Sequence, residues 1–208
     1  MKKLLTIFCL VLLVSCSNEV PHDQLVERRG ITYEVNSTTP FTGISIKDYS
    51  TIEGGIYREG FKNGLATGFK ERFTHEGVLE YRYDFYIEDG ERVEVTEDYY
   101  PNGQLKRKFH YVRKNEEVDS ISNESYYENG QLWFKNNYLT GHGESYHRNG
   151  QLQCGPPDNN IARCYHPNGE LREKGMILNG EQTGLWEYFD EEGNLTKTEE
   201  YKDGELIE

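Results

Sequence analysis

The chain has 208 residues and a formal net charge of −13 at pH 7, with 36 acidic and 23 basic side chains. A surface this acidic repels the phosphate backbone of nucleic acids, so we exclude nucleic acid as a partner and favour basic proteins. Hydrophobic residues make up only 35% of the chain, but 16 Tyr, 9 Phe and 2 Trp are more aromatic residues than a disordered chain carries. We therefore expect a folded protein with thin layers and little aliphatic core.

The first 15 residues have the features of a secretory signal. Two lysines follow the first Met, and an apolar run extends over residues 4–15. A membrane helix needs about 20 residues, whereas the apolar part of a secretory signal is shorter. We expect residues 1–15 to be a signal peptide. Its removal would take Lys2 and Lys3 with it and change the net charge to −15.

Residues 13–16, Leu-Val-Ser-Cys, resemble the lipobox of bacterial lipoproteins, in which the cysteine is acylated and becomes the first mature residue. The resemblance implies that Cys16 carries acyl chains such as palmitate, and several such chains hold a protein durably on a membrane. Ser17 in place of Asp favours the outer membrane, by resemblance to enterobacterial sorting. The alternative is an ordinary signal peptide with an incidental cysteine. We expect residues 16–30 to be a lipidated N-terminus and tether, and residues 31–208 to be a repeat domain.

A short phrase of aromatic residues, a turn and a leucine recurs along the chain. A second phrase, seen best in KNGLATGFKERF from Lys62 and LNGEQTGLWEYF from Leu178, lies between its copies. The copies of the first phrase are HEGVL at Gly77, YYPNGQL at Gly103, YYENGQL at Gly130, YHRNGQL at Gly150, YHPNGEL at Gly169 and EEGNL at Gly193. Such a period predicts a chain built from repeated supersecondary units.

Each copy of the first phrase predicts a β-hairpin. Asn129-Gly130 can take positive φ at both positions, as a two-residue type I′ turn requires. This turn would pair Tyr126 with Trp133 and place both on the same face. Hairpins stacked in this way contact mainly their neighbours. We therefore predict an all-β fold, an elongated antiparallel meander or solenoid of stacked hairpins.

The repeated phrase resembles the MORN repeat, in the bacterial variant found in proteins often labelled YwqK-family antitoxins. The resemblance covers residues 39–208 and implies the fold, but it says little about activity because one scaffold supports many functions. Two segments depart from the pattern: residues 110–125, which lack a glycine turn, and the loop between Cys154 and Cys164. We expect both to be irregular, and irregular loops often carry specificity.

Cys154 and Cys164 flank the segment GPPDNNIAR, whose Pro, Asp and Asn residues favour a turn. Folding this loop back would place the two sulfurs on facing strands. In an oxidising envelope we expect a disulfide. The alternative is a pair of free buried thiols.

The sequence contains no motif that points to catalysis. It has no GxSxG elbow, no glycine-rich phosphate loop and no HExxH pair. His147 and His166 occupy the repeat position that Tyr100 and Tyr127 hold, so we interpret them as members of one row rather than as metal ligands. We expect a protein that is not an enzyme and that holds no cofactor or metal.

Aromatic residues also precede the turns, and we expect Tyr188 to continue the row that Tyr99 begins. Most of these side chains should pack the sheet. A single-layer sheet has two faces, however, so some could form an exposed platform. The candidate interaction surface comprises Tyr126, Trp133, Tyr146, Tyr165 and Trp186.

Three functions are compatible with these features. The first is a non-enzymatic lipoprotein, anchored through Cys16, whose repeats bind another envelope protein of basic character. The second, taken from the family label, is an antitoxin or immunity protein that masks a toxin on the envelope side of the membrane. The third is binding of glycan or peptidoglycan by stacking on aromatic side chains.

Overall fold

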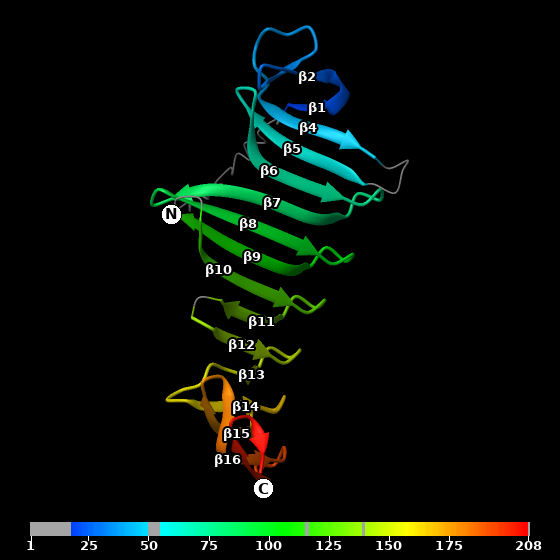
Figure 1. Cartoon of the computed structure of the whole chain (residues 1–208). Helices are drawn as coiled ribbons and strands as arrows, with labels where there is room; N and C mark the ends of the chain where they lie inside the picture. Colours follow the sequence, from blue (N-terminus) through cyan, green and yellow to red (C-terminus); the bar gives the residue numbers. More distant parts are fainter. Residues whose placement is uncertain (1–17, 50–54, 115–116, 139, 208) are drawn as a thin grey trace, which may run out of the picture. The chain divides into compact units, whose positions relative to one another are not determined.

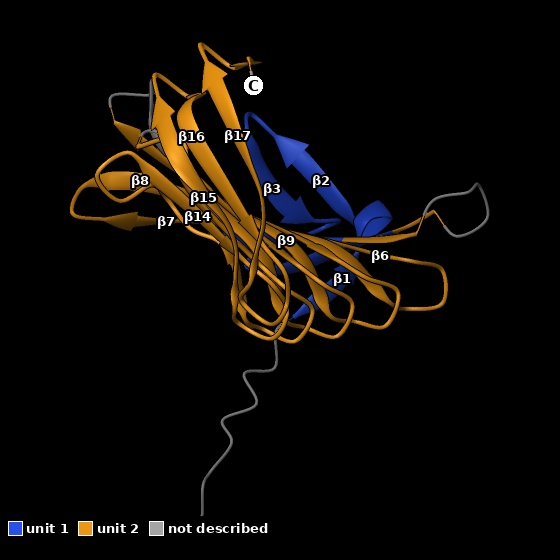
Figure 2. Ribbon diagram, turned by 90° about the horizontal axis from the view of Figure 1, so that it is seen from below, with its two compact units in different colours: residues 1–47, 58–67 blue, residues 48–57, 68–208 orange. Residues whose placement is uncertain are grey.

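The structure is a computed structural model that describes residues 18–49, 55–114, 117–138 and 140–207. Its described elements are β-strands and one short 3-10 turn, η1 (His22–Gln24). The chain divides into two compact units, residues 1–47 with 58–67 and residues 48–57 with 68–208 (Figure 2). The predicted all-β fold is confirmed.

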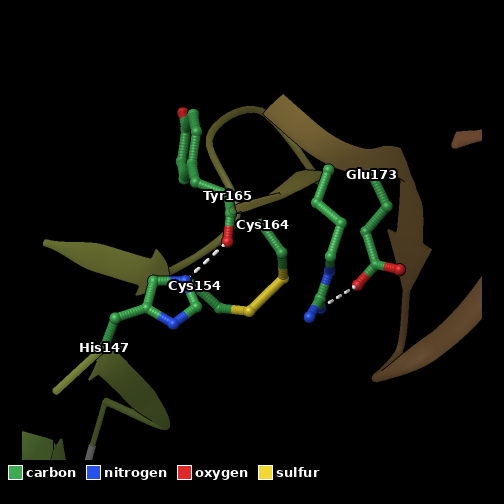
Figure 3. Close-up of a disulfide and its surroundings, with 6 residues drawn as sticks. His147, Cys154, Cys164, Tyr165 and Glu173 are labelled. Carbon is green, nitrogen blue, oxygen red and sulfur yellow. Dashed lines mark hydrogen bonds and ion pairs between the residues drawn. A yellow bond between two sulfur atoms is a disulfide. The ribbon is translucent and has the colours of Figure 1, made fainter. Parts of the chain in front are cut away.

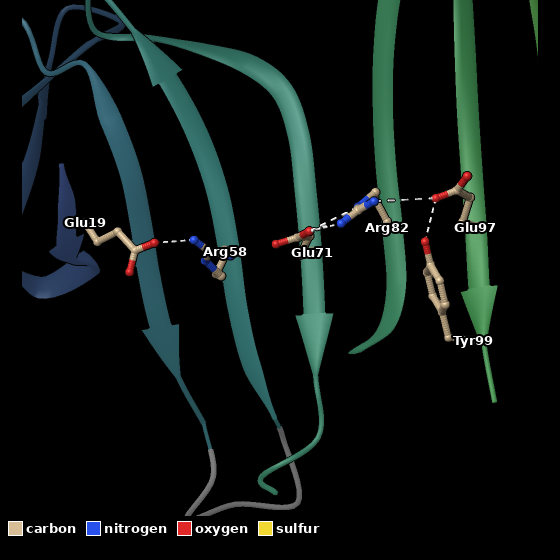
Figure 4. Close-up of polar contacts among 6 residues, drawn as sticks. All are labelled: Glu19, Arg58, Glu71, Arg82, Glu97 and Tyr99. Carbon is tan, nitrogen blue, oxygen red and sulfur yellow. Dashed lines mark hydrogen bonds and ion pairs between the residues drawn. The ribbon is translucent and has the colours of Figure 1, made fainter. Parts of the chain in front are cut away.

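The smaller unit begins with β1 (Glu19–Pro21), which pairs in parallel with β4 (Gly43–Asp48). A hairpin of β2 (Leu25–Arg28) and β3 (Ile31–Glu34) follows η1. Among the described residues of this unit, Val20, Phe41 and Ser45 have buried side chains. Glu19 forms an ion pair with Arg58 of β5 (Ile56–Lys62) (Figure 4).

The prediction of a tether over residues 16–30 is wrong from Glu19 onward, because this segment contains β1, η1 and β2. Val20 is only 6% exposed, and the N–H of Ile44 donates to the carbonyl of Asn18 at 2.8 Å. Burial of Val20 and strand pairing therefore order this segment, although its polar composition resembles that of a linker. The expected signal peptide and Cys16 lie outside the described residues.

The larger unit is an antiparallel meander. From β6 (Leu65–Phe73) onward, each strand pairs with the next in chain order (Figure 1). The stacked hairpins that the repeats predicted are therefore confirmed. The further strands are β7 (Leu79–Glu88), β8 (Glu91–Tyr99), β9 (Leu105–Lys114), β10 (Glu117–Tyr126), β11 (Leu132–Asn137), β12 (His142–Tyr146), β13 (Leu152–Cys154), β14 (Ile161–Tyr165), β15 (Leu171–Leu178), β16 (Glu181–Phe189), β17 (Leu195–Lys202) and β18 (Glu205–Leu206).

The described part of the expected irregular segment, residues 110–114 and 117–125, belongs instead to the paired strands β9 and β10. His110 pairs with Ser122, and the antiparallel register of β9 and β10 runs from Arg107 opposite Ser125 to Lys114 opposite Glu117 with one shift. Strand pairing therefore continues through a stretch that lacks the usual glycine turn. The sequence therefore lacks the glycine that marks a turn elsewhere, although β9 and β10 pair.

Two kinds of turn recur between the strands of the larger unit. The turn after β10 is a five-residue turn, in which the N–H of Gly130 donates to the carbonyl of Tyr127 and the N–H of Tyr127 donates to the carbonyl of Gln131, each at 2.9 Å. Gly130 has φ of 82°, whereas Asn129 does not have a positive φ. The predicted type I′ turn at Asn129-Gly130 is therefore wrong. Two-residue turns with two positive φ angles occur instead in the other phrase, as at Asn179-Gly180, with φ of 54° and 87°.

A β-bulge follows each five-residue turn and changes which residues share a face. Tyr126 pairs with Leu132 and Ser125 pairs with Phe134, so Trp133 is the extra residue of the bulge. The same shift occurs beside Phe73, Tyr99, Tyr146, Tyr165 and Phe189. The predicted pairing of Tyr126 with Trp133 is therefore wrong by one residue.

The larger unit has little hydrophobic interior. Among its described residues, Val93 at 5% and Trp186 at 4% exposure are the buried hydrophobic side chains. Trp186 packs over Gly175, where an added Cβ would lie 2.2 Å from the indole ring. Aromatic side chains therefore find space where the neighbouring strand has a glycine.

Candidate functional site

A row of alternating acidic and basic side chains crosses seven neighbouring strands, from β6 to β12. Paired residues of an antiparallel sheet lie on the same face, so these side chains share one face. We call this set the charged row: Glu71, Arg82, Glu97, Lys108, Glu124, Lys135 and Glu144, each opposite the next.

Ion pairs connect most of the charged row. Arg82 donates from Nε and Nη2 to Oε1 of Glu71 at 3.0 and 2.8 Å, and its Nη1 lies 3.9 Å from Oε2 of Glu97 (Figure 4). Lys108 Nζ lies 3.3 Å from Oε1 of Glu97. The side chain of Glu71 is only 5% exposed, so Arg82 compensates a carboxylate that the sheet has removed from water.

Tyrosines beside the turns donate to three of the four acids of this row. The Tyr99 hydroxyl donates to Glu97 at 2.7 Å and the Tyr126 hydroxyl donates to Glu124 at 2.5 Å. Tyr146 makes the same bond to Glu144. Burial, together with the hydrogen bond to a carboxylate, raises the pKa of Tyr99 and of Tyr126 to about 12. These phenols therefore remain hydrogen-bond donors at any physiological pH.

The pKa values of two carboxylates in this row, Glu97 and Glu144, are lowered. Burial opposes ionisation of Glu97, but hydrogen bonds from Tyr99 and Lys108 outweigh it and lower its pKa. Hydrogen bonds from Tyr146 and Lys135 lower the pKa of Glu144. Both carboxylates are charged at neutral pH.

A pocket of about 190 Å³ lies over β10, β11 and β12. A second, smaller hollow beside it is lined by Lys108, His110, Ser122 and Glu124. Ser122 and Glu124 line both, so the two hollows adjoin along β10. The pocket is lined by Ser122, Asn123, Glu124, Lys135, Asn136, Asn137, His142 and Glu144.

The five-residue turns are linked by a second row of hydrogen bonds. Tyr127 donates its hydroxyl to the carbonyl of Tyr146 at 2.9 Å, and His147 Nε2 lies 2.7 Å from the carbonyl of Tyr165. Tyr100 and His166 make the equivalent contacts, at 2.8 and 2.9 Å, with the carbonyls of Tyr126 and Phe189. The two histidines therefore take the positions of the tyrosines, as the repeat alignment indicated.

The hydrogen bonds between the turns show that one predicted position, Tyr188 in the row that begins at Tyr99, was wrong. His166 contacts the carbonyl of Phe189, and Phe189 pairs with Leu195 as Tyr165 pairs with Leu171. Phe189, rather than Tyr188, is thus the residue equivalent to Tyr165. The sequence alone does not show this one-residue difference because Tyr188 and Phe189 are both aromatic and adjacent.

The predicted interaction surface is only partly exposed. Trp133 is 50% exposed and its ring centroid lies 6.1 Å from that of Tyr127, not beside Tyr126. Tyr126, Tyr146 and Tyr165 are half-buried. Including Trp186 was wrong, because it is buried against Gly175.

Cys154 and Cys164 face each other on β13 and β14, and their sulfurs are bonded. The two-residue turn that brings them together is Asn159-Asn160, with φ of 49° and 65°. Figure 3 shows the disulfide beside the ring of His147, which points to the carbonyl of Tyr165. The disulfide thus lies on the strands, beside the row of contacts that links the turns.

The charged row was not among the predicted sites, although the sequence carries a signal for it. In each of the four units that supply an acid of the charged row, a glutamate stands two residues before the aromatic residue that precedes the turn, and Glu187 and Phe189 of a fifth unit have the same spacing. Strand alternation places such a glutamate on the same face as that aromatic residue. The pairs are Glu71 with Phe73, Glu97 with Tyr99, Glu124 with Tyr126 and Glu144 with Tyr146.

Neither a metal-ligand cluster nor a membrane-spanning helix occurs among the described residues. No group of three or more His, Cys, Asp or Glu side chains in this part of the chain could hold a metal ion. No helix within the described ranges combines the length and apolarity that crossing a membrane requires.

Comparison with known proteins identifies the repeats. Four segments, residues 95–113, 123–139, 159–179 and 182–203, match the MORN repeat variant. A search of curated proteins gave no match to this chain. The unmatched turns Thr74–Val78 and His147–Gln151 have the same hydrogen bonds as the matched ones, so the structure extends the pattern beyond the matched segments. The larger unit is thus a sheet of MORN-like repeats, in which four segments match the MORN repeat variant.

Proposed function

We propose that this protein is a non-enzymatic lipoprotein whose repeat sheet binds another protein of the cell envelope, with acyl chains on Cys16 holding it at the outer membrane. MORN repeats are often protein-binding. The Leu-Val-Ser-Cys motif and the preceding apolar run support the anchor. The net charge of −13 favours a partner of basic character.

One observation carries the binding role. An antiparallel sheet usually covers one face with a hydrophobic core, but Val93 and Trp186 are the buried hydrophobic side chains among the described residues of the larger unit. Large apolar side chains are instead exposed, and such groups commonly mark interaction sites. They include Tyr86, Ile87, Trp133, Tyr138, Met176, Leu178 and Leu185, at 43–64% exposure.

The test is crosslinking of the lipidated protein in native envelopes, followed by purification, with a Cys16→Ala variant as the control for position. We expect one protein in stoichiometric amount, absent from the variant, that binds the purified chain in calorimetry. Recovery of no such protein would contradict the proposal. A secreted, toxin-like partner would identify the protein as an immunity protein.

A second candidate is glycan binding, which the exposure of Trp133 favours. Aromatic faces open to solvent can stack on sugar rings, and Tyr127 lies beside Trp133. Binding to purified cell wall that is lost in Trp133→Ala but retained in Trp186→Phe would support it. Equal binding by the Trp133→Ala variant would exclude this surface.

A further inference from the structure

Glu124 differs from the other acids of the charged row because no ion pair to it occurs among the described residues. Its register neighbours are Lys108 and Lys135. Lys108 Nζ lies 3.3 Å from Glu97 and Lys135 Nζ lies 3.0 Å from Glu144, so both ammonium groups pair on the side away from Glu124. The described contact of the Glu124 carboxylate is the hydroxyl of Tyr126, at 2.5 Å.

This carboxylate lies at the junction of the two hollows. It lines the pocket of about 190 Å³ and also the smaller hollow. By register, Ser122 lies between His110 and Asn137, and Asn137 is opposite His142, so these polar side chains share the face of Glu124. The surroundings offer hydrogen-bond partners to a polar guest on both sides of Glu124.

The chemistry of Glu124 selects a cationic guest. An ionised carboxylate accepts about four hydrogen bonds, and the Tyr126 hydroxyl uses one. Hydrogen bonds between a carboxylate and an ammonium or guanidinium group are about twice as strong as those between neutral groups. The acidic charge of the chain, −13, would also draw a basic surface toward it.

We propose that the pocket beside Glu124 receives a lysine or arginine side chain of the basic partner, with Glu124 as its ion-pair acceptor. Ser122, Asn137 and His142 line the pocket around the incoming group. The charged row has four acids and three bases, so another molecule would supply the fourth cation. This inference rests on the proposed protein-binding function and names the point of recognition.

The test uses the full chain in detergent micelles and small probes in place of the partner. The probes are the N-acetyl, N-methylamide derivatives of arginine and lysine, with the citrulline derivative as a neutral match for arginine. Backbone NMR resonances of residues 122–124 and 142–144 report occupancy. We expect saturable shifts with the two cationic probes and about tenfold weaker binding of citrulline, as expected for one lost charge-assisted bond.

Two variants decide the assignment. Glu124→Gln keeps an oxygen that can accept from Tyr126 but removes the charge, and it should weaken binding of the arginine probe about tenfold. Glu200→Gln, which neutralises an exposed carboxylate of β17, should bind as the unmodified chain does. Equal affinity of Glu124→Gln and the unmodified chain, or equal binding of citrulline, would overturn the inference.

The same variants separate this inference from the proposed function. If the envelope crosslinking recovers a stoichiometric partner with both variants alike, the protein-binding function stands and the role of Glu124 fails. If it recovers none even with the unmodified chain, the proposed function itself fails. Loss of the partner in Glu124→Gln, but not in Glu200→Gln, together with the probe result supports both.

Discussion

At the scale of single residues, burial decides which charged side chains matter for stability. Glu71 and Glu80 both pair with an arginine, but the Glu71 side chain is 5% exposed and that of Glu80 is 42% exposed. A surface ion pair contributes little because water and salt screen it. Removing one partner of a buried pair leaves an uncompensated charge or an unpaired donor.

We therefore expect Glu71→Ala to lower the free energy of unfolding by about 1–3 kcal/mol, since Arg82 loses two hydrogen bonds. Glu80→Ala removes the exposed pair with Arg72 and should cost less than about 1 kcal/mol. Urea unfolding of both variants measures the difference. Equal costs for the two would show that the burial of Glu71 has no energetic role.

Tyr99 and Tyr126 give a prediction at alkaline pH. Their pKa values in the folded protein are raised from 10.0 to about 12. Their stabilising contribution is therefore complete below pH 10.0 and is lost as the pH rises toward 12. In an alkaline titration, the absorbance of tyrosinate should rise in a step near pH 12, and the height of this step should be smaller in Tyr126→Phe. A Tyr126→Phe variant that instead loses absorbance near pH 10.0 would contradict this prediction.

At the scale of elements, the five-residue turns are stabilised both within themselves and by the next turn. Asn129 Oδ1 accepts from the N–H of Gln131 at 3.2 Å, and its Nδ2 donates to the carbonyl of Arg148 at 3.1 Å. Asn102, Asn149 and Asn168 make the same two bonds in their turns. One side chain thus shapes its own turn and fixes its distance to the neighbour.

The substitution Asn129→Asp separates these two roles. Aspartate keeps the acceptor for Gln131 but lacks the donor for the carbonyl of Arg148, so the bond between turns is lost. We expect a loss of about 1 kcal/mol in the free energy of unfolding and faster hydrogen exchange in residues 146–151. Asn129→Ala, which loses both bonds, should cost about twice as much. An aspartate variant as stable as the unmodified chain would show that the turns do not support one another.

At the scale of the whole molecule, the larger unit is a sequence of neighbour-to-neighbour contacts. Each strand from β7 to β17 pairs with the strand before and the strand after it, and β18 pairs with β17. Stability in such a meander is close to a sum over neighbouring units. A local change should therefore have a local effect.

Deleting residues 203–208 tests this expectation. The deletion removes β18, whose register partners are Tyr201 and Lys202 of β17. We expect faster hydrogen exchange in β17 and unchanged protection in β7 to β12, because no described pairing connects them to β18. Loss of protection across all of these strands would show that the sheet unfolds as one cooperative unit.

The sequence by itself determined the repeat, the hairpins and their order. The aromatic-turn-leucine phrase recurs because each unit packs against adjacent units of the same kind. The fold of one unit therefore predicts the fold of the others. The sequence also showed that His147 takes the repeat position of Tyr127, and both side chains contact a carbonyl beside the next turn. Facing cysteines followed from a turn-rich loop between two strands.

Only the tertiary structure decided which side chains meet. One bulge per turn moved Trp133 from Tyr126 to Tyr127, since a shift of a single residue reverses the faces of a strand. Trp186 became buried because Gly175, 11 residues earlier, lies across from it. Glu124 has no ion-pair partner among the described residues because Lys108 pairs with Glu97 and Lys135 pairs with Glu144. Such pairings depend on the register of three strands at once, which no short stretch of sequence contains.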